Sequence, residues 1–359
     1  MLIGIEASHA AKENRTRVEE YCFQVIQELK KIIPSGERVV LYVNERKKSI
    51  KSKVHKVERQ KYGSVLLDEL PENWEVKELW WPFKKGWSQV RLSWEFLFRK
   101  PDIFFAPGQL VPFICPKNTV SMIHDSGFKV FPQAYNFWGR QYLKLMNWMV
   151  LRKSKIIVTS TEFNKQELLR LYGKKFENKI KIVPLGYDHK NFHLEFENKS
   201  AEVLLKYKIT RPFILSVGRL EEKKNTLRVV QSFNNLKSSI LNLKLLLVGK
   251  PGVGYEEIKN EIEKSPFKND IVQPGFVPTE ELPELLCAAE AFVFPSLYEG
   301  FGIPILEAMA VGCPVVASKG NALEEVGGEA AVYVDPKNAE EIAAAIVNVT
   351  SDLKLRGEK

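Results

Sequence analysis

Two carboxylates eight positions apart, Glu299 and Glu307, flank a pair of glycines after a buried apolar run. The pattern of residues 294–308 predicts a strand, a loop with Gly300 and Gly302, and a helix. Glycines let backbone N–H groups approach a ligand closely, and a helix N-terminus offers unpaired N–H groups with partial positive charge. Glu299 can accept hydrogen bonds from a polyhydroxylated group, and Glu307 from ribose hydroxyls. This loop therefore predicts a site for a phosphorylated, hydroxyl-rich ligand.

The cations that such a ligand needs stand in a second loop, residues 216–225, which also follows a strand and precedes a helix. Arg219 can bind two phosphate oxygens at once, and Lys224 adds a point charge. Taken singly, a loop carboxylate is usually solvated, and an arginine after a strand usually forms a surface ion pair. Both loops fall at the same edge of one predicted sheet, so together they favour a diphosphate site.

The elements that would position these loops alternate regularly along the chain. Strands are predicted over residues 2–7, 39–43, 103–106, 119–124, 155–160 and 180–184, and again over 213–217, 244–248, 271–274, 291–295, 314–318 and 331–334. Helices are predicted at 18–33, 88–98, from 161, at 226–236, from 255, at 279–289, at 304–311 and from 339. The alternation indicates βαβ units and a parallel sheet in each half. We place an N-terminal domain at 1–189 and a C-terminal domain at 190–359.

Length and composition agree with a two-domain soluble chain. The 359 residues are 45% hydrophobic and 27% charged, which excludes wholesale disorder, collagen and a coiled coil. No apolar run approaches the roughly 18 residues that span a bilayer, and the chain meets an acid at Glu6, so we expect a cytoplasmic protein. The widely spaced cysteines predict buried free thiols rather than disulfides or metal ligands.

Charge is unevenly distributed. Residues 1–200 hold 35 Lys and Arg against 22 Asp and Glu, whereas residues 201–359 hold 18 against 22. A basic half suits an anionic partner, but no nucleic-acid-binding pattern accompanies it, so nucleic acid is disfavoured. Aromatic residues interleaved with lysine at 80–87 suit sugar faces or a membrane interface, or else a core cluster. The core is favoured for Trp94, and both alternatives stay open for Trp87 and for Lys84 with Lys85.

The sequence resembles the retaining glycosyltransferases of family 4, the group 1 glycosyl transferases, and most of all their mannosyltransferase-like members. The resemblance runs over nearly the whole chain and rests on the Glu-x7-Glu motif formed by Glu299 and Glu307, and on the basic loop at 218–225. It implies an α/β fold of two Rossmann-like domains facing across a cleft, the GT-B fold.

The resemblance also implies roles for single residues. Arg219 and Lys224 would neutralise the diphosphate of a nucleotide sugar, Glu299 would contact the transferred sugar, and His124 would face that sugar from the N-terminal domain, next to Asp125. Donor-binding positions would be Gly218, Lys250, Phe276, Val277, Gly300, Phe301, Gly302 and the ribose-binding Glu307. No metal and no cofactor besides the donor are implied.

Two features depart from the family pattern. Arg17 stands where the family usually has a glycine, before the first long helix, so it either obstructs the cleft or adds a phosphate contact. The sequence also stops at Lys359, without the helix that usually crosses back onto the N-terminal domain.

We therefore expect transfer of a hexose, first of all mannose from GDP-mannose, to a hydroxyl of a saccharide or lipid-linked acceptor in cell-surface glycan synthesis. UDP-glucose and related donors stay open. The reaction would retain the anomeric configuration without a metal, with a covalent glycosyl-enzyme as the rival route. The basic half favours an acceptor at an anionic membrane, at the inner face of the plasma membrane. The alternative is a catalytically impaired sugar-nucleotide or glycan-binding protein. A dehydrogenase ranks low because no GxGxxG follows the first strand.

Overall fold

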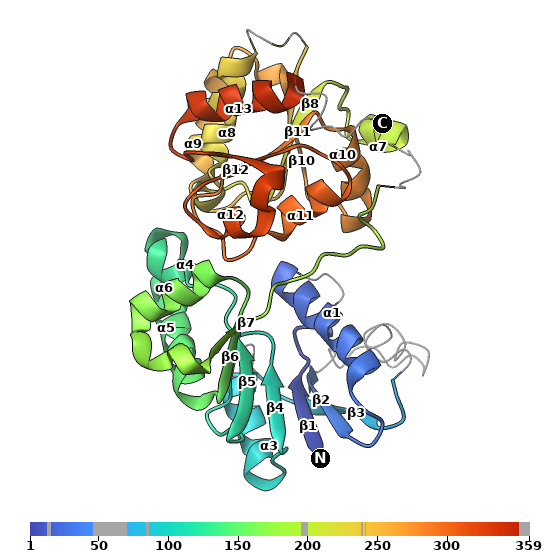
Figure 1. Ribbon diagram of the computed structural model, residues 1–359, viewed down its shortest axis with the longest axis vertical. Helices are drawn as coiled ribbons and strands as arrows, with labels where there is room; N and C mark the ends of the chain where they lie inside the picture. Colours follow the sequence, from blue (N-terminus) through green and yellow to red (C-terminus); the bar gives the residue numbers. More distant parts are fainter. Residues whose placement is uncertain are drawn as a thin grey trace. The chain divides into compact units, whose positions relative to one another are not determined.

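The computed structural model describes residues 1–12, 16–45, 70–83, 86–194, 200–237, 240 and 242–351, and the chain divides into two compact units. The first unit comprises residues 1–124, 137–159 and 167–183, and the second comprises 125–136, 160–166 and 184–359. Each unit is built on one parallel β-sheet, as Figure 1 shows. The parallel sheets predicted for both halves of the chain are thus confirmed.

The sheet of the first unit has seven strands in the order β3-β2-β1-β4-β5-β6-β7. All neighbouring strands pair in parallel. The strands are β1 (Leu2–Glu6), β2 (Arg38–Glu45), β3 (Trp74–Trp80), β4 (Ile103–Ala106), β5 (Asn118–Met122), β6 (Ile156–Thr159) and β7 (Ile180–Ile182).

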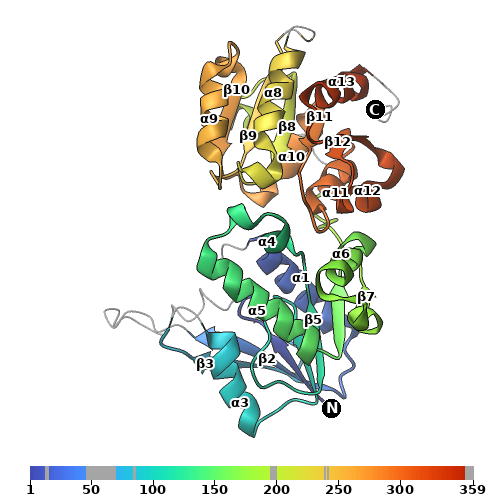
Figure 2. The ribbon, with the colours of Figure 1, turned by 90° about the vertical axis from the view of Figure 1, so that its left-hand side faces the viewer.

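Helices cover both faces of this sheet because successive strand residues point to opposite sides. Leu41 of β2 packs in one hydrophobic cluster with α1 (Arg17–Ile32). The next residue, Tyr42, packs in another cluster with α3 (Leu92–Phe98) and α5 (Phe137–Lys153). The π-helical turn η2 (Trp87–Arg91) leads into α3, and α3 and α5 lie on the same side of the sheet, facing the viewer in Figure 2. The helix α6 (Glu162–Tyr172) and the 3-10 turn η4 (Lys174–Lys179) precede β7.

The sheet of the second unit has six parallel strands in the order β10-β9-β8-β11-β12-β13. They are β8 (Phe213–Val217), β9 (Lys244–Val248), β10 (Ile271–Gly275), β11 (Ala291–Phe294), β12 (Val315–Ser318) and β13 (Ala331–Val334). Leu245 and Leu247 of β9 pack with α8 (Thr226–Leu236), α9 (Tyr255–Lys264) and α13 (Ala339–Ser351). Leu246 faces the opposite cluster, with α7 (Ser200–Lys206), α10 (Leu282–Ala288) and α11 (Ile303–Ala310).

Shorter elements complete the second unit. They are α4 (Gly127–Val130), α12 (Ala322–Gly327) and the 3-10 turns η3 (Pro132–Ala134), η5 (Glu222–Lys224), η6 (Lys268–Asp270), η7 (Thr279–Glu281) and η8 (Gly328–Ala330). All twelve predicted strands are present, whereas β3 and several helices, α5 and α7 among them, were not predicted. The start of α6 was predicted, and Thr161 caps it by accepting a hydrogen bond from the Asn164 N–H at 3.1 Å.

The aromatic region differs in part from its prediction. Trp87 is buried in the core and donates from Nε1 to the Leu79 carbonyl. The core placement of Trp94 is wrong, because this side chain is 61% exposed while Phe96 of the same helix takes the buried position. Lys84 and Lys85 lie outside the described residues. The cysteines are free as predicted, but Cys115 and Cys287 are only partly buried.

Candidate active site

The two loops singled out by the sequence leave neighbouring strands. Strand β8 pairs directly with β11, so residues 218–225 and 295–302 emerge at the same, carboxyl-terminal edge of the sheet. Hydrogen bonds join the loops: the Asn225 side-chain amide donates to the Pro295 carbonyl at 2.9 Å, and the Leu297 N–H donates to the Lys223 carbonyl at 2.9 Å. The predicted convergence of the loops is therefore a feature of the fold.

Lys224 and Glu299 form a hydrogen-bonded ion pair across these loops. Burial alone would raise the pKa of the Glu299 carboxyl. The positive charges of Lys224 and Lys223, with the hydrogen bond from Lys224, outweigh burial and hold this pKa below its ordinary value. Glu299 is therefore a buried, ionised carboxylate at neutral pH, held in place by a lysine that is itself only partly buried.

A second lysine, Lys223, adds a positive charge near this ion pair. Its Nζ lies 3.4 Å from the Asp125 carboxylate and 5.5 Å from the centre of the Tyr298 ring. Burial would lower the pKa of Lys223, but the carboxylates of Asp125 and Glu299 raise it well above its ordinary range, so the ammonium stays charged. Sequence reasoning missed Lys223, because a lysine in a loop usually lies in solvent.

The helix that follows Glu299 begins at a position that only glycine suits. Gly302 caps α11 with φ +106°, and a Cβ there would lie 2.2 Å from Leu323 Cδ2. Pro304 stands in the first turn, where a missing N–H costs nothing. Glu307, one turn into α11, is buried. The helix N-terminus and both motif carboxylates thus occupy one short stretch of chain.

Three side chains of the second unit converge on a single carbonyl of this stretch. Asn164 Nδ2 donates to the Gly300 oxygen at 2.6 Å, Ser160 Oγ at 3.0 Å and Thr161 Oγ1 at 3.2 Å. All three side chains are buried. Because the peptide group is planar, fixing this oxygen also fixes the direction of the Phe301 N–H on its opposite side. These three residues, which we call the Gly300 clamp, were not found from the sequence.

Other residues predicted to bind the donor lie in the loops that follow β8 and β9. The methylene groups of Lys224 lie 3.6 Å from where a Cβ of Gly218 would be, and a Cβ on Gly249 would collide with the Gly218 carbonyl at 1.7 Å, so these two loops touch through their backbones. Arg219 is exposed, with Nε 3.5 Å from the Glu221 carboxylate.

The loop after β10 supplies an aromatic side chain. Lys250 Nζ lies 5.5 Å from the centre of the exposed Phe276 ring, and Val277 is buried in the core. The backbone of this region is tied together as well, since the Leu220 N–H donates to the Lys250 carbonyl at 3.0 Å. Lys250, Phe276 and the buried Val277 thus follow the ends of neighbouring strands, β9 and β10.

Two of the predicted site residues, His124 and Arg17, belong to the first unit and have different neighbours there. His124 Nε2 lies 2.9 Å from the Pro107 carbonyl, and its ring meets the Tyr21 ring edge-on at 4.9 Å. Arg17 is the exposed first residue of α1. Asp125, the neighbour of His124 in sequence, belongs to the second unit and contacts Lys223 there. The functional roles of all these residues stay predictions.

Comparison with known proteins shows which family and which relatives this chain is similar to. The family described as "Glycosyl transferases group 1" matches residues 200–358. The O-antigen chain mannosyltransferase B of Escherichia coli is 29% identical over 280 residues, which are 77% of this chain and 71% of the relative. The C-terminal part of the chain thus matches this family, and both comparisons support glycosyltransferase activity.

Other similar proteins agree with this placement. The MMP alpha-(1->4)-mannosyltransferase of Mycolicibacterium hassiacum is 31% identical over 205 residues, which are 56% of this chain and 46% of that relative. The solved structure of HepE from Anabaena in complex with UDP-glucose matches 99% of this chain and 91% of its own with a TM-score of 0.70, at 16% identity. These likenesses support an α/β, two-domain GT-B fold, as the sequence predicted.

Proposed function

We propose that the glycosyltransferase moves mannose from GDP-mannose to a hydroxyl of a saccharide or lipid-linked acceptor, with retention of the anomeric configuration. The sugar is suggested by the printed functions of two relatives, both of which are mannosyltransferases. UDP-glucose is the second choice, because HepE is described with that donor. The observation that carries the proposal is the buried Glu299 carboxylate held ionised by Lys224 at the edge of the sheet.

Lys224 suits the departing diphosphate. Its ammonium has three N–H donors, so it can keep one on Glu299 and direct the others to phosphate oxygens. Arg219, exposed after the end of the preceding strand, and the N-terminus of α11 add positive charge at the same edge of the sheet. Fixed positive charges of this kind stabilise a leaving phosphate electrostatically, so we propose that the reaction needs no metal.

Glu299 suits the sugar. A carboxylate that stays ionised in a buried position can accept hydrogen bonds from sugar hydroxyls and stabilise positive charge at the anomeric carbon. We propose that the acceptor hydroxyl attacks from the face of the departing diphosphate and passes its proton to a phosphate oxygen. A covalent intermediate would need Glu299 as a nucleophile, and its bond to Lys224 makes it a poorer one.

The distribution of charge along the chain is the basis for the proposed acceptor. The first 200 residues carry an excess of 13 positive charges, which favours an acceptor presented at an anionic membrane surface on the cytoplasmic side. The cytoplasmic location follows from the sequence expectation alone, and no described helix is long and apolar enough to cross a bilayer.

A donor panel tests the proposal. The protein is melted with GDP-mannose, GDP-fucose, UDP-glucose and UDP-galactose, and a donor that binds the native state raises the melting temperature. Transfer of the best donor to a disaccharide acceptor is then followed by proton NMR of the new anomeric centre. We expect the largest shift with GDP-mannose and an α-linked product. A larger shift with a UDP-sugar overturns the donor, and a β-linked product overturns retention.

A further inference from the structure

One face of the first unit carries a concentration of exposed apolar side chains. Of the 22 large hydrophobic side chains exposed among the described residues, ten lie in η2, α3, α5 and the loop residue Phe113. Soluble proteins rarely expose such a group without a partner. Six of them, Trp94 and Phe98 of α3 and Trp138, Tyr142, Leu145 and Trp148 of α5, are what we call the aromatic face.

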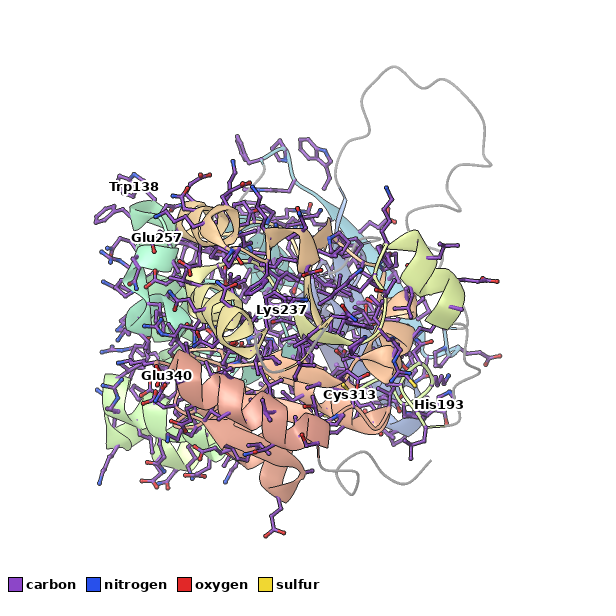
Figure 3. All side chains as sticks on the ribbon, turned by 90° about the horizontal axis from the view of Figure 1, so that it is seen from above. Trp138, His193, Lys237, Glu257, Cys313 and Glu340 are labelled. Carbon is purple, nitrogen blue, oxygen red and sulfur yellow. The ribbon has the colours of Figure 1, made fainter. Side chains whose placement is uncertain are left out.

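The aromatic face of α5 is a helical stripe. Trp138, Tyr142, Leu145 and Trp148 are spaced by four, three and three residues, so they share one side of the helix, while Met146 and Val150 lie on a different side and enter the core. Trp138 is 80% exposed and points outward at the periphery in Figure 3. The stripe is therefore additional to the core-packing side of α5.

Hydrogen bonds connect α5 with η2, the turn that leads into α3. The Tyr142 hydroxyl donates to Gln89 Oε1 in η2 at 3.1 Å, and Gln89 Nε2 lies 3.4 Å from the Met146 sulfur. Gln89 also accepts the Phe113 N–H at its backbone oxygen, and Phe113 accepts a hydrogen bond from Lys153 at the end of α5. Residues of η2, α5 and Phe113 are thus connected by hydrogen bonds.

The charged residues around the aromatic face indicate the kind of partner that it would bind. Helix α5 carries four basic residues and no acidic one. Lys144 is exposed beside the stripe, and the Arg152 guanidinium lies 4.6 Å from the centre of the Trp148 ring. The one acid of η2 and α3, Glu95, is buried and paired with Lys77 and Arg91, so it presents no negative charge to a partner. Tryptophan and tyrosine next to basic residues are the composition of surfaces that lie in lipid headgroups.

We propose that the aromatic face docks on a bilayer containing anionic phospholipid, with the indoles of Trp138 and Trp148 in the headgroup layer and Lys144 and Arg152 at lipid phosphates. This inference deepens the proposed function, on which it rests for the membrane-borne acceptor, and it assigns the contact to a defined surface. Burial of apolar side chains and attraction to anionic lipid would contribute together, so binding should need both.

Vesicle flotation of the full chain tests this inference without donor or acceptor. We expect binding to vesicles of equal parts phosphatidylglycerol and phosphatidylcholine, and little binding to phosphatidylcholine alone. Trp138→Ala with Trp148→Ala should weaken binding at least about tenfold, because two indoles leave the interface. The matched control is Trp80→Ala, which removes an indole of similar exposure, 44% against 47% for Trp148, from a strand outside the face.

A charge-reversal pair, Lys144→Glu with Arg152→Glu, provides a second variant and should weaken binding to anionic vesicles to a similar degree. Equal loss in Trp80→Ala, equal binding to neutral vesicles, or no binding by the wild type would overturn the proposal. The proposal would also be overturned if the aromatic face joins two copies of the chain. In that case the wild type would be a dimer and the double alanine variant a monomer. The melting-temperature response to nucleotide sugars should be unchanged in these variants, so failure here is distinguishable from failure of the proposed reaction.

Discussion

Lys224 Nζ donates a hydrogen bond to the Glu299 carboxylate, and this bond ties the last residue of η5 to the loop that leads into α11. The two residues are 75 positions apart, and they meet because β8 and β11 are neighbours in the sheet. The pair joins the group proposed to receive the diphosphate to the group proposed to face the sugar. Without Lys224, Glu299 would keep Lys223 as a compensating positive charge but lose its hydrogen-bonded partner.

The first prediction concerns the pH dependence of stability. The folded-state pKa of Glu299 is held below its ordinary value of 4.5, so the ionised carboxylate stabilises the fold above that pH. This contribution is lost as the pH falls through the folded-state pKa. In urea unfolding followed from neutral to acid pH, the wild type should therefore lose stability below about pH 4.5 more steeply than Glu299→Gln. Parallel curves for the two proteins would contradict the lowered pKa.

The second prediction concerns the start of α11. Gly302→Ala places a methyl group at positive φ and against Leu323, and it should destabilise the protein by about 3 kcal/mol or more. Gly320→Ala is the matched control, because Gly320 also has positive φ but has open space around it, and about 1 kcal/mol is expected. Chemical denaturation measures both. Equal costs would mean that the approach of Leu323 to Gly302 does not constrain the site.

The third prediction concerns the Gly300 clamp. Asn164→Ala removes donors from the Gly300 carbonyl and from Ser160 Oγ, and should cost about 1–3 kcal/mol of stability. Because the clamp fixes the peptide next to Glu299, kcat/KM for the donor should also fall about tenfold. The control is Gln166→Ala, an exposed residue of the same helix that bonds to Glu162. Lower stability with an unchanged rate would show that the clamp does not position Glu299.

The fourth prediction separates the enzyme from a binding protein of the same fold. Arg17 is exposed at the first position of α1, so Arg17→Gly should cost less than about 1 kcal/mol. We expect the wild type to transfer sugar and the glycine variant to stay within about threefold of it, since the Arg17 side chain is exposed. Turnover by Arg17→Gly alone would mean that Arg17 disables the natural chain.

The sequence predicted the strands and the two chemical loops because both depend on local patterns. Buried parallel strands are short apolar runs, and Gly302 with Pro304 is a local signature of a helix start. The placement of both loops at one edge followed from the general rule for parallel sheets, without knowledge that β8 and β11 are adjacent.

The rest depended on contacts distant in sequence. Asn164 reaches Gly300 across 136 positions, and no periodicity in either segment indicates this contact. In the sequence, Lys223 resembles a solvated loop lysine. Only the structure shows its contacts with Asp125 and Tyr298. Helix α5 escaped prediction because its exposed side also carries large apolar side chains, which weakens the helical pattern.

The central claim is that Lys224, paired with Glu299, holds the diphosphate of a nucleotide sugar, and calorimetric titration with GDP-mannose tests it most directly. Lys224→Ala is compared with Lys319→Ala, which removes a lysine from an exposed ion pair with Glu341 in the same unit. We predict that Lys224→Ala weakens donor binding by about 30-fold or more, whereas Lys319→Ala binds as the wild type does. Equal donor affinity in wild type and Lys224→Ala, with both proteins folded, would contradict the account.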